Sequence, residues 1–390
     1  MKIMLFNLHY SPNLGDGVIA DCLSHGLRTA APGAEVVSVD ISGRTDPGTV
    51  TIRNRALALK ALRVMPAGLR QKVVLNRLEA LLDRVEPVWR AALEGADMAV
   101  IGGGQLFSDA DLNFPAKIAR VSGLLTGARI PVAIHAVGVS PNWSGQGAQL
   151  FNRVFDADLR AVGVRDRPSL DAWTSQAAQP APAPRLTPDP GLLAAATYGE
   201  APSADRRTAL CVTAPEVLSY HADGAIAGRG GLGFFEALAL DIANREGGVR
   251  LFCNGAAEDA AALARLARRP AVRAALAAGT AEIAPTPATP AELAATVAAS
   301  RAVVAHRLHA CILGYAYRRP VVGLGWDRKV KSFFEGVGLD RFFVGDETAD
   351  PGHVARLAED AIAQGMEEGA HARVVDDTRA AIAETLRRLT

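Results

Sequence analysis

The sequence lacks any apolar run long enough to cross a membrane. Across its 390 residues, no segment approaches the roughly 18 consecutive apolar residues of a membrane-spanning helix. The opening stretch, MKIMLFNLHYSPNLGD, has only a short apolar run before its polar residues, which is too little for a signal peptide. We therefore expect a soluble protein without an integral membrane segment.

Charge imbalance and paired cysteines are also missing. The 42 Lys and Arg residues nearly balance the 41 Asp and Glu residues, so nucleic acid is not an expected partner, and peripheral membrane association would depend on a local cluster. The four cysteines are far apart, form no C-x-x-C pair and lie mostly in apolar runs: Cys22, Cys211, Cys253 and Cys311. This pattern is typical of reduced core residues and predicts a cytoplasmic protein.

Two further absences concern cofactors. No group of His, Cys, Asp or Glu residues has the spacing of metal ligands, so we predict no metal. The run Gly102-Gly103-Gly104 does not match the spaced glycine fingerprint of dinucleotide-binding folds, so we predict no nicotinamide cofactor.

What the chain does contain is a regular alternation of short β-prone segments with longer helical ones. Its length exceeds one ordinary core and fits two domains. Predicted strands span residues 2–6, 35–40, 98–101 and 131–139 in the first half, with a short strand and turn at 186–190, and 208–213, 249–253, 281–284, 302–305 and 320–324 in the second. We expect two doubly wound α/β domains, over residues 1–190 and 208–345, then helices over 350–390, with a ligand site in the crevice between the domains.

The densest group of chemically active side chains lies between residues 303 and 339. Two predicted strands are each followed directly by such residues: His306, Arg307, Leu308 and His309 after the first, and Asp327 and Lys329 after the second. Parallel strands bring their carboxyl ends to one edge of the sheet, where open α/β sheets bind ligands. We expect the two groups to meet there. Two structural alternatives stay open, an ion pair of Lys329 with Asp327 and a core position for the histidines.

A loop near the start of the chain carries a second set of candidates. Asn13, Gly15 and Asp16 fall in a turn just before a helical pattern of apolar residues. They are therefore expected at a helix N-terminus, whose backbone N–H groups can hold an anion. The alternative is that Asp16 simply caps the helix.

Further candidates follow other strands of the first half. Gly103 and Gly104 let a ligand or another part of the backbone approach closely. The polar residues near the ends of these strands are Gln105, Asp109, His135 and Arg165. A structural ion pair of Arg165 with Asp166 and a core position for His135 are the alternatives.

Six short motifs, in this order, resemble the polysaccharide pyruvyl transferase family. They are Asn-x-Gly-Asp at Asn13 to Asp16, Gly-Gly-Gly-x-Leu-Phe-x-Asp at Gly102 to Asp109, Arg165-Asp166 with Ser169, Asp189-Pro190, Arg307-Leu308-His309, and the segment from Trp326 to Leu339. The match is spread over nearly the whole chain. The resemblance implies two Rossmann-like domains in a GT-B-like arrangement, with the acceptor bound by the first domain and the donor by the second.

The resemblance also implies a reaction. The enolpyruvyl unit of phosphoenolpyruvate would move onto two hydroxyls of a saccharide or lipid-linked saccharide, giving a pyruvate ketal and free phosphate. Arg307 would clamp the phosphate or carboxylate of the donor, with Lys329 as a second positive charge. His309 would deliver a proton to the methylene carbon.

Two departures from the family pattern concern the donor pocket. Thr213 and the two residues after it stand where members often carry an arginine, so Arg229 in the nearby loop would substitute, or the donor is held differently. His135 replaces the first residue of the family's common Gln-Gly-x-Gly. It would be a second proton-transfer or donor-binding residue, or it marks a different acceptor.

Two other functions fit the same pattern less well. A GT-B glycosyltransferase using a nucleotide sugar would share the fold. Many such enzymes hold the ribose with a glutamate just before the strand at 320–324, and here no acidic residue lies between Glu292 and Asp327. A non-catalytic sugar- or phosphate-binding protein is the third hypothesis, against which the joint presence of Arg307 and His309 argues.

Overall fold

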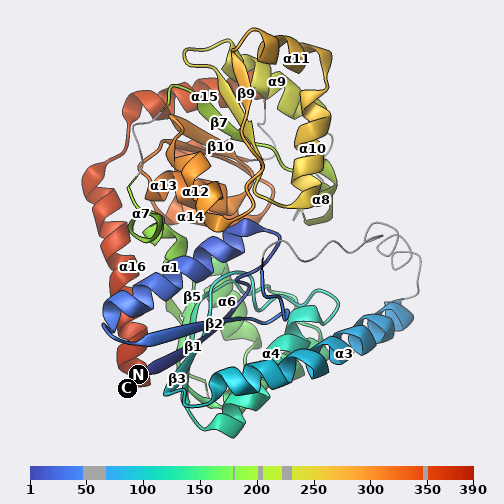
Figure 1. Ribbon diagram of the computed structural model, residues 1–390, viewed down its shortest axis with the longest axis vertical. Helices are drawn as coiled ribbons and strands as arrows, with labels where there is room; N and C mark the ends of the chain where they lie inside the picture. Colours follow the sequence, from blue (N-terminus) through green and yellow to red (C-terminus); the bar gives the residue numbers. More distant parts are fainter. Residues whose placement is uncertain (47–66, 179–180, 201–204, 222–230, 346–349) are drawn as a thin grey trace. The chain divides into compact units, whose positions relative to one another are not determined.

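The chain folds into two compact units. The computed structural model describes residues 1–46, 67–178, 181–200, 205–221, 231–345 and 350–390, with residues 67–74 and 219–221 as backbone only. The first unit consists of Met1–Ser11, Ile19–Pro190 and Arg379–Thr390, and the second of Pro12–Val18 and Gly191–Thr378. Two helices contribute to both units: α1 (Leu14–Ala30), near the start of the chain, and α16 (Glu368–Leu389), at its end (Figure 1).

A six-stranded parallel sheet forms the centre of the first unit. Its strands are β1 (Lys2–Asn7), β2 (Glu35–Asp40), β3 (Met98–Gly102), β4 (Pro131–Val137), β5 (Asp158–Val164) and β6 (Arg185–Leu186), in the spatial order β2-β1-β3-β4-β5-β6. The strands β1, β3 and β4 are buried almost from end to end, which explains their continuous apolar sequences. The strand order reverses between β1 and β3, and sheets of this kind bind ligands beside such a reversal.

Helices flank this sheet, and its core is rich in aromatic rings. The helices are α3 (Ala67–Leu93), α4 (Asn113–Ala128), α5 (Gly145–Asn152) and α6 (Arg167–Gln176), with the short η1 (Arg153–Asp156) and parts of α1 and α16. The ring centroid of Phe107 lies 5.0 Å from that of Phe151 and 5.1 Å from that of Trp173. Because Phe107 is fully buried, this packing fixes the loop that follows β3.

The second unit has its own six-stranded parallel sheet. Its strands are β7 (Thr208–Cys211), β8 (Val249–Phe252), β9 (Ala281–Ile283), β10 (Ala302–Ala305), β11 (Val321–Leu324) and β12 (Phe343–Val344), in the order β12-β11-β10-β7-β8-β9. This strand order is one of the two common orders of doubly wound sheets, with the reversal between β7 and β10. The carboxyl ends of these two strands therefore mark the expected ligand position.

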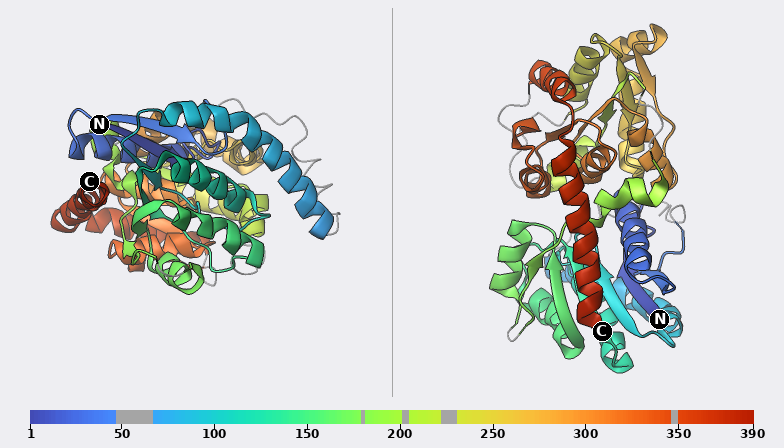
Figure 2. Two further views of the ribbon diagram at one scale, coloured as in Figure 1. Left: turned by 90° about the horizontal axis from the view of Figure 1, so that it is seen from below. Right: turned by 90° about the vertical axis from the view of Figure 1, so that its left-hand side faces the viewer.

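Helices also flank the second sheet (Figure 2). They are α7 (Ala194–Tyr198), α8 (Pro215–His221), α9 (Leu232–Ala243), α10 (Ala257–Ala267), α11 (Pro270–Ala277), α12 (Pro290–Ala298), α13 (Leu308–Ala316), α14 (Arg328–Gly336) and α15 (Pro351–Gln364), with η2 (Pro190–Leu193) and η3 (Asp340–Phe342). α13 is buried from His309 to Ala316. A Cβ atom at Gly314 would lie only 2.8 Å from Val321 Cγ2, so this glycine lets α13 lie directly against β10 and β11.

The two sheets confirm the α/β class that the alternating sequence pattern predicts. The strands predicted at 98–101, 302–305 and 320–324 are found as β3, β10 and β11. The structure adds β5, which was not among the predicted strands, and β12, whose two residues are too few to show a period. Among the described residues, no helix is long and apolar enough to span a bilayer.

Candidate functional site

A buried ion pair lies at the carboxyl ends of β7 and β10. Arg307, which follows β10, directs Nε and Nη2 to one oxygen of Asp259, at 2.9 and 2.7 Å. The other oxygen of Asp259 accepts the backbone N–H of Ala214, which follows β7, at 2.8 Å. The Asp259 side chain is fully buried, and that of Arg307 is 13% exposed. The pair therefore fixes the guanidinium where the strand order reverses.

Asp259 is a site residue that the sequence did not reveal. It stands in the first turn of α10 next to Glu258, where acidic residues are common because they favour the positive end of the helix dipole. No sequence signal separates it from an ordinary first-turn residue. Burial raises the pKa of Asp259, and the positive charge of Arg307 offsets only part of that effect. Removing one member of such a buried pair costs about 3–5 kcal/mol, because the other is left uncompensated.

His309 contacts the first turn of α1 within the second unit. It is the second residue of α13 and is 8% exposed. A Cβ atom at Gly15 would lie 2.2 Å from His309 Nδ1, so only glycine fits this position. The imidazole thus lies between the N-terminal turns of two helices, where partial positive charge favours an anion.

The loop before α1 is held by the end of β8. The backbone N–H of Leu14 donates to the carbonyl of Asn254 at 3.3 Å, and the side-chain amide of Asn254 donates to Asn13 Oδ1. The backbone N–H of Asp16 donates to the carbonyl of Asn13 at 3.0 Å, so the turn is closed before the helix begins. The structure thus brings three residues predicted from the start of the chain, Asn13, Gly15 and Asp16, into the same unit as His309.

The segment after β11 places an aromatic ring beside Arg307. Trp326 Nε1 donates to the carbonyl of His306 at 2.6 Å, and its ring lies 5.8 Å from Arg307 Cζ and 5.9 Å from Lys329 Nζ. Asp327 caps α14 and pairs with Lys329 Nζ at 2.7 Å. The structural alternative for Lys329, an ion pair with Asp327, is therefore what the structure shows.

His306 and Leu308 face apolar surroundings. The His306 ring is buried and lies 5.5 Å from the ring of Phe235. Burial, reinforced by the charge of Arg307, lowers the pKa of His306 to about 3, so its ring is neutral at ordinary pH. Leu308 packs against the buried cluster that includes Ile312. These surroundings favour a structural role for both side chains.

In the first unit, Gln105 and Arg165 meet at the carboxyl ends of β3 and β5. Arg165 Nη2 donates to Gln105 Oε1 at 2.6 Å, and Arg165 Nε lies 3.3 Å from Asp166 Oδ2. A Cβ atom at Gly138 would lie 2.3 Å from Gln105 Oε1, so this glycine makes room for the pair. The ion pair with Asp166, the structural alternative weighed from the sequence, is present, and Arg165 is held against Gln105.

The glycine run and Asp109 hold the same loop region in place. The backbone N–H of Gly103 donates to the carbonyl of His135, and the carbonyl of Gly104 accepts the N–H of Gly138. Asp109 Oδ2 accepts both the backbone N–H and the hydroxyl of Ser144, each at 2.7 Å. Gly103 thus lies against backbone and also against the side chain of Ile19, whose Cγ2 would be 2.1 Å from a Cβ atom at this position. Asp109 anchors the start of α5.

His135 is fully buried in the first unit, whereas Arg307 and His309 belong to the second. Its Nδ1 lies 2.8 Å from the hydroxyl of Thr385 on α16. Burial lowers the pKa of His135 to about 4. A neutral imidazole without solvent exposure matches the core position weighed from the sequence better than proton transfer to a saccharide.

Arg229 lies outside the described residues, so its role in holding the donor stays a prediction. Within the described ranges, no three His, Cys, Asp or Glu side chains are grouped so that they could hold a metal ion. All four cysteines are buried thiols, and burial raises the pKa of Cys211 and Cys253. They behave as the core residues that the sequence predicts.

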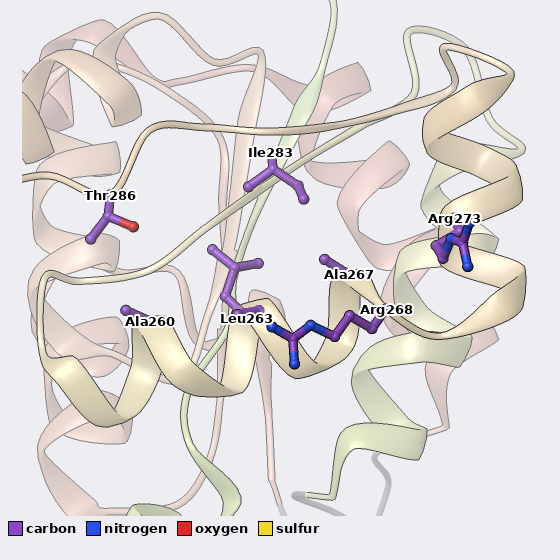
Figure 3. A pocket seen from close by; sticks show the side chains of 8 residues that line it. Ala260, Leu263, Ala267, Arg268, Arg273, Ile283 and Thr286 are labelled. Atoms are coloured by element: carbon purple, nitrogen blue, oxygen red, sulfur yellow. The ribbon is translucent and has the colours of Figure 1, made fainter.

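A groove in the second unit lies beside the edge strand β9 (Figure 3). It is lined by Ala260, Leu263, Ala264, Ala267, Arg268, Arg273, Ile283 and Thr286. Most of these side chains are small or apolar, and none belongs to the candidates drawn from the sequence. The lining therefore includes none of the residues described around Arg307.

The sequence matches a known family over most of its length. A family model for polysaccharide pyruvyl transferase covers residues 13–328. The chain belongs to the polysaccharide pyruvyl transferase family. The resemblance indicated by the six motifs is thus confirmed, and the family implies a transferase that acts on polysaccharide. A search of curated proteins finds no match.

Solved structures show the fold of this pyruvyl transferase family member but share little sequence with it. A putative UDP-N-acetylglucosamine 2-epimerase from Listeria monocytogenes is 14% identical, covers 98% of this chain and 93% of its own, and has a TM-score of 0.51. The E. coli ADP-heptose lps heptosyltransferase II is 15% identical over 93% of this chain and 99% of its own, with a TM-score of 0.48. The Listeria similarity extends over both units and, with the two parallel sheets, confirms the predicted GT-B-like fold class.

The contact between Gly15 and His309 gives a first prediction. Gly15→Ala should lower the free energy of unfolding by about 1–3 kcal/mol, because the new methyl group overlaps the imidazole. Gly127→Ala in α4 is the matched control, since nothing lies within 4 Å of its Cβ position. Urea unfolding of both variants measures the difference. Equal stability of the two would contradict the contact.

The buried His135 gives a second prediction, on pH. Its pKa falls from the ordinary 6.5 to about 4 on folding, so between these values the unfolded chain binds more protons and stability falls as the pH falls. Between pH 7 and pH 4, the free energy of unfolding should fall by about 3 kcal/mol less in His135→Gln than in the wild type. Chemical unfolding across this range measures both chains, and identical pH profiles would refute the assignment.

Proposed function

We propose that the protein moves the enolpyruvyl unit of phosphoenolpyruvate onto two hydroxyls of a saccharide, giving a pyruvate ketal and free phosphate. The observation that carries this proposal is the grouping of Arg307 and His309 within one unit. Arg307 is fixed by Asp259, and His309 lies against the first turn of α1. Family membership supports a transferase, and these side chains supply what the donor requires.

The donor carries a phosphate and a carboxylate, and Arg307 suits either one. Asp259 engages Nε and Nη2 through a single oxygen, which sets the plane of the guanidinium and leaves Nη1 as the nitrogen outside the pair. A planar guanidinium binds phosphate or carboxylate with defined geometry. The N-terminal turns of α1 and α13 add partial positive charge beside it. The proposal needs no metal ion, because these groups meet the negative charge of the donor.

His309 performs the proton transfers in this proposal. Its protonated ring delivers a proton to the methylene carbon of the donor, and the first sugar hydroxyl adds to the adjacent carbon and returns its proton to His309. The bond from that carbon to the phosphate oxygen then breaks. The second hydroxyl adds to the same carbon, and its proton leaves with the phosphate. One hydroxyl proton thus ends on the new methyl group and the other on phosphate.

A glycosyltransferase using a nucleotide sugar is the alternative. Such an enzyme would share the fold. In this chain no acidic residue lies between Glu292 and Asp327 to hold a ribose, and the nearby buried carboxylate of Asp259 is already bonded to Arg307 and Ala214. These observations favour phosphoenolpyruvate.

Phosphate release tests the proposal. With phosphoenolpyruvate and an acceptor saccharide, His309→Ala should lower the rate by roughly 100-fold or more, the usual contribution of a general acid. His353→Ala, an exposed histidine on α15, is the matched control and should release phosphate at the wild-type rate. Undiminished phosphate release by His309→Ala would overturn the assignment of the general acid. A wild-type protein that binds nucleotide sugars and not phosphoenolpyruvate would overturn the function.

A further inference from the structure

A buried lysine in the first unit donates to a hydroxyl, and no carboxylate among the described residues is hydrogen-bonded to it. Lys117 of α4 is only 5% exposed. Its Nζ donates to the hydroxyl of Ser42 at 2.8 Å and lies 5.3 Å from the ring centroid of Phe114. Burial lowers the pKa of Lys117 to about 8, which still leaves the ammonium charged at neutral pH. A buried charge with a neutral partner costs free energy unless an anion compensates it.

A second cation, Arg44, lies two residues after Ser42. Arg44 Nη1 is buried, lies 3.7 Å from Asp40 Oδ2 and has no hydrogen-bond partner within the described ranges. Asp40 ends β2, and its two oxygens already accept the backbone N–H groups of Ser42, at 2.6 Å, and Tyr10, at 2.9 Å. Lys117 and Arg44 thus share the single carboxylate of Asp40, which is already hydrogen-bonded. The three side chains together keep an excess positive charge.

Carboxylates near Arg44 in the sequence, and on α3 beside α4, have other partners. Asp46 accepts the hydroxyl of Thr45 at 3.4 Å, and Glu79, Asp83 and Glu86 pair with Arg120. The excess positive charge of Lys117 and Arg44 over Asp40 therefore favours an anion from outside the chain.

Two rings that could contact a sugar, those of His9 and Tyr10, lie close to Asp40. The rings of His9 and Tyr10 are stacked, with centroids 4.5 Å apart, and both residues are partly exposed. His9 is held by Asp21 at 2.8 Å and by Ser38 at 3.1 Å. The backbone N–H of Tyr10 donates to Asp40, so the stacked pair and the cations share one anchor. Rings with an apolar face and a polar edge are common partners of mixed polar and apolar ligands.

We propose that Lys117 and Arg44 bind an anionic group, a phosphate or a carboxylate, of the saccharide acceptor, with the His9–Tyr10 pair beside the sugar. This inference rests on the proposed function, for which it specifies the acceptor class. The site lies at the carboxyl ends of β1 and β2, next to the reversal of strand order where sheets of this type bind ligands.

Calorimetry of the full chain without phosphoenolpyruvate tests the site. The ligands are hexose 1-phosphates, hexuronic acids, the uncharged methyl hexosides and inorganic phosphate. At least one anionic saccharide should bind tenfold or more tightly than its methyl hexoside, and more tightly than inorganic phosphate. The stronger of the two saccharide arms identifies the anion. Equal binding of charged and uncharged sugars, or no advantage over inorganic phosphate, would overturn the inference.

Variants separate ligand binding from a structural role. Lys117→Met and Arg44→Met should each lose the preference for the anionic sugar, while Arg28→Met, at the end of α1, should retain it. Lys117→Met should also unfold at the same or higher urea concentration than the wild type, because it removes a buried charge. Loss of stability with the anion preference intact would show that Lys117 is structural. Phosphate release from phosphoenolpyruvate remains the separate test of the reaction, so failure of either proposal can be recognised.

Discussion

The ion pair between Asp259 and Arg307 is the interaction on which the arrangement of the second unit's site depends. It joins three strand ends of one sheet: Asp259 lies in the first turn of the helix after β8, Arg307 follows β10, and Ala214 after β7 donates to the same carboxylate. Because the carboxylate is fully buried, its charge is stable only while the guanidinium stays against it. Folding alone thus fixes the position of Arg307, without a bound ligand.

In both sheets, polar and charged residues lie together at the carboxyl ends of the strands. In the second unit, polar residues follow β7, β10 and β11 at the carboxyl edge, next to the reversal of strand order. In the first unit, Tyr10 follows β1, Asp40 ends β2 and Arg165 follows β5 at the corresponding edge. Parallel strands with helical connections place all their carboxyl ends on one side, so residues far apart in sequence meet there without further devices. A reaction with two substrates can use one such edge for each, which is how the proposed function divides donor and acceptor.

The sequence predicted the fold well because fold and periodic pattern are directly linked. The buried strands β3, β10 and β11 have continuous apolar sequences, and the polar residues after them are visible as sudden changes in composition. The partners of these residues were not visible. Asp259 resembles any first-turn acid, and the contact between Asn13 and Asn254 joins residues 241 positions apart. Burial was equally hidden, since nothing in the run around His135 shows that its ring faces Thr385.

The central claim is that Arg307, held in place by Asp259, binds phosphoenolpyruvate. Titration of phosphoenolpyruvate into the wild type and into Arg307→Lys, followed by calorimetry, tests it most directly. Lysine keeps the positive charge but cannot both reach Asp259 through two nitrogens and present a third. The account predicts that Arg307→Lys binds the donor at least about tenfold more weakly, about 1.4 kcal/mol, while remaining folded. Equal affinity of the two proteins for phosphoenolpyruvate would contradict it.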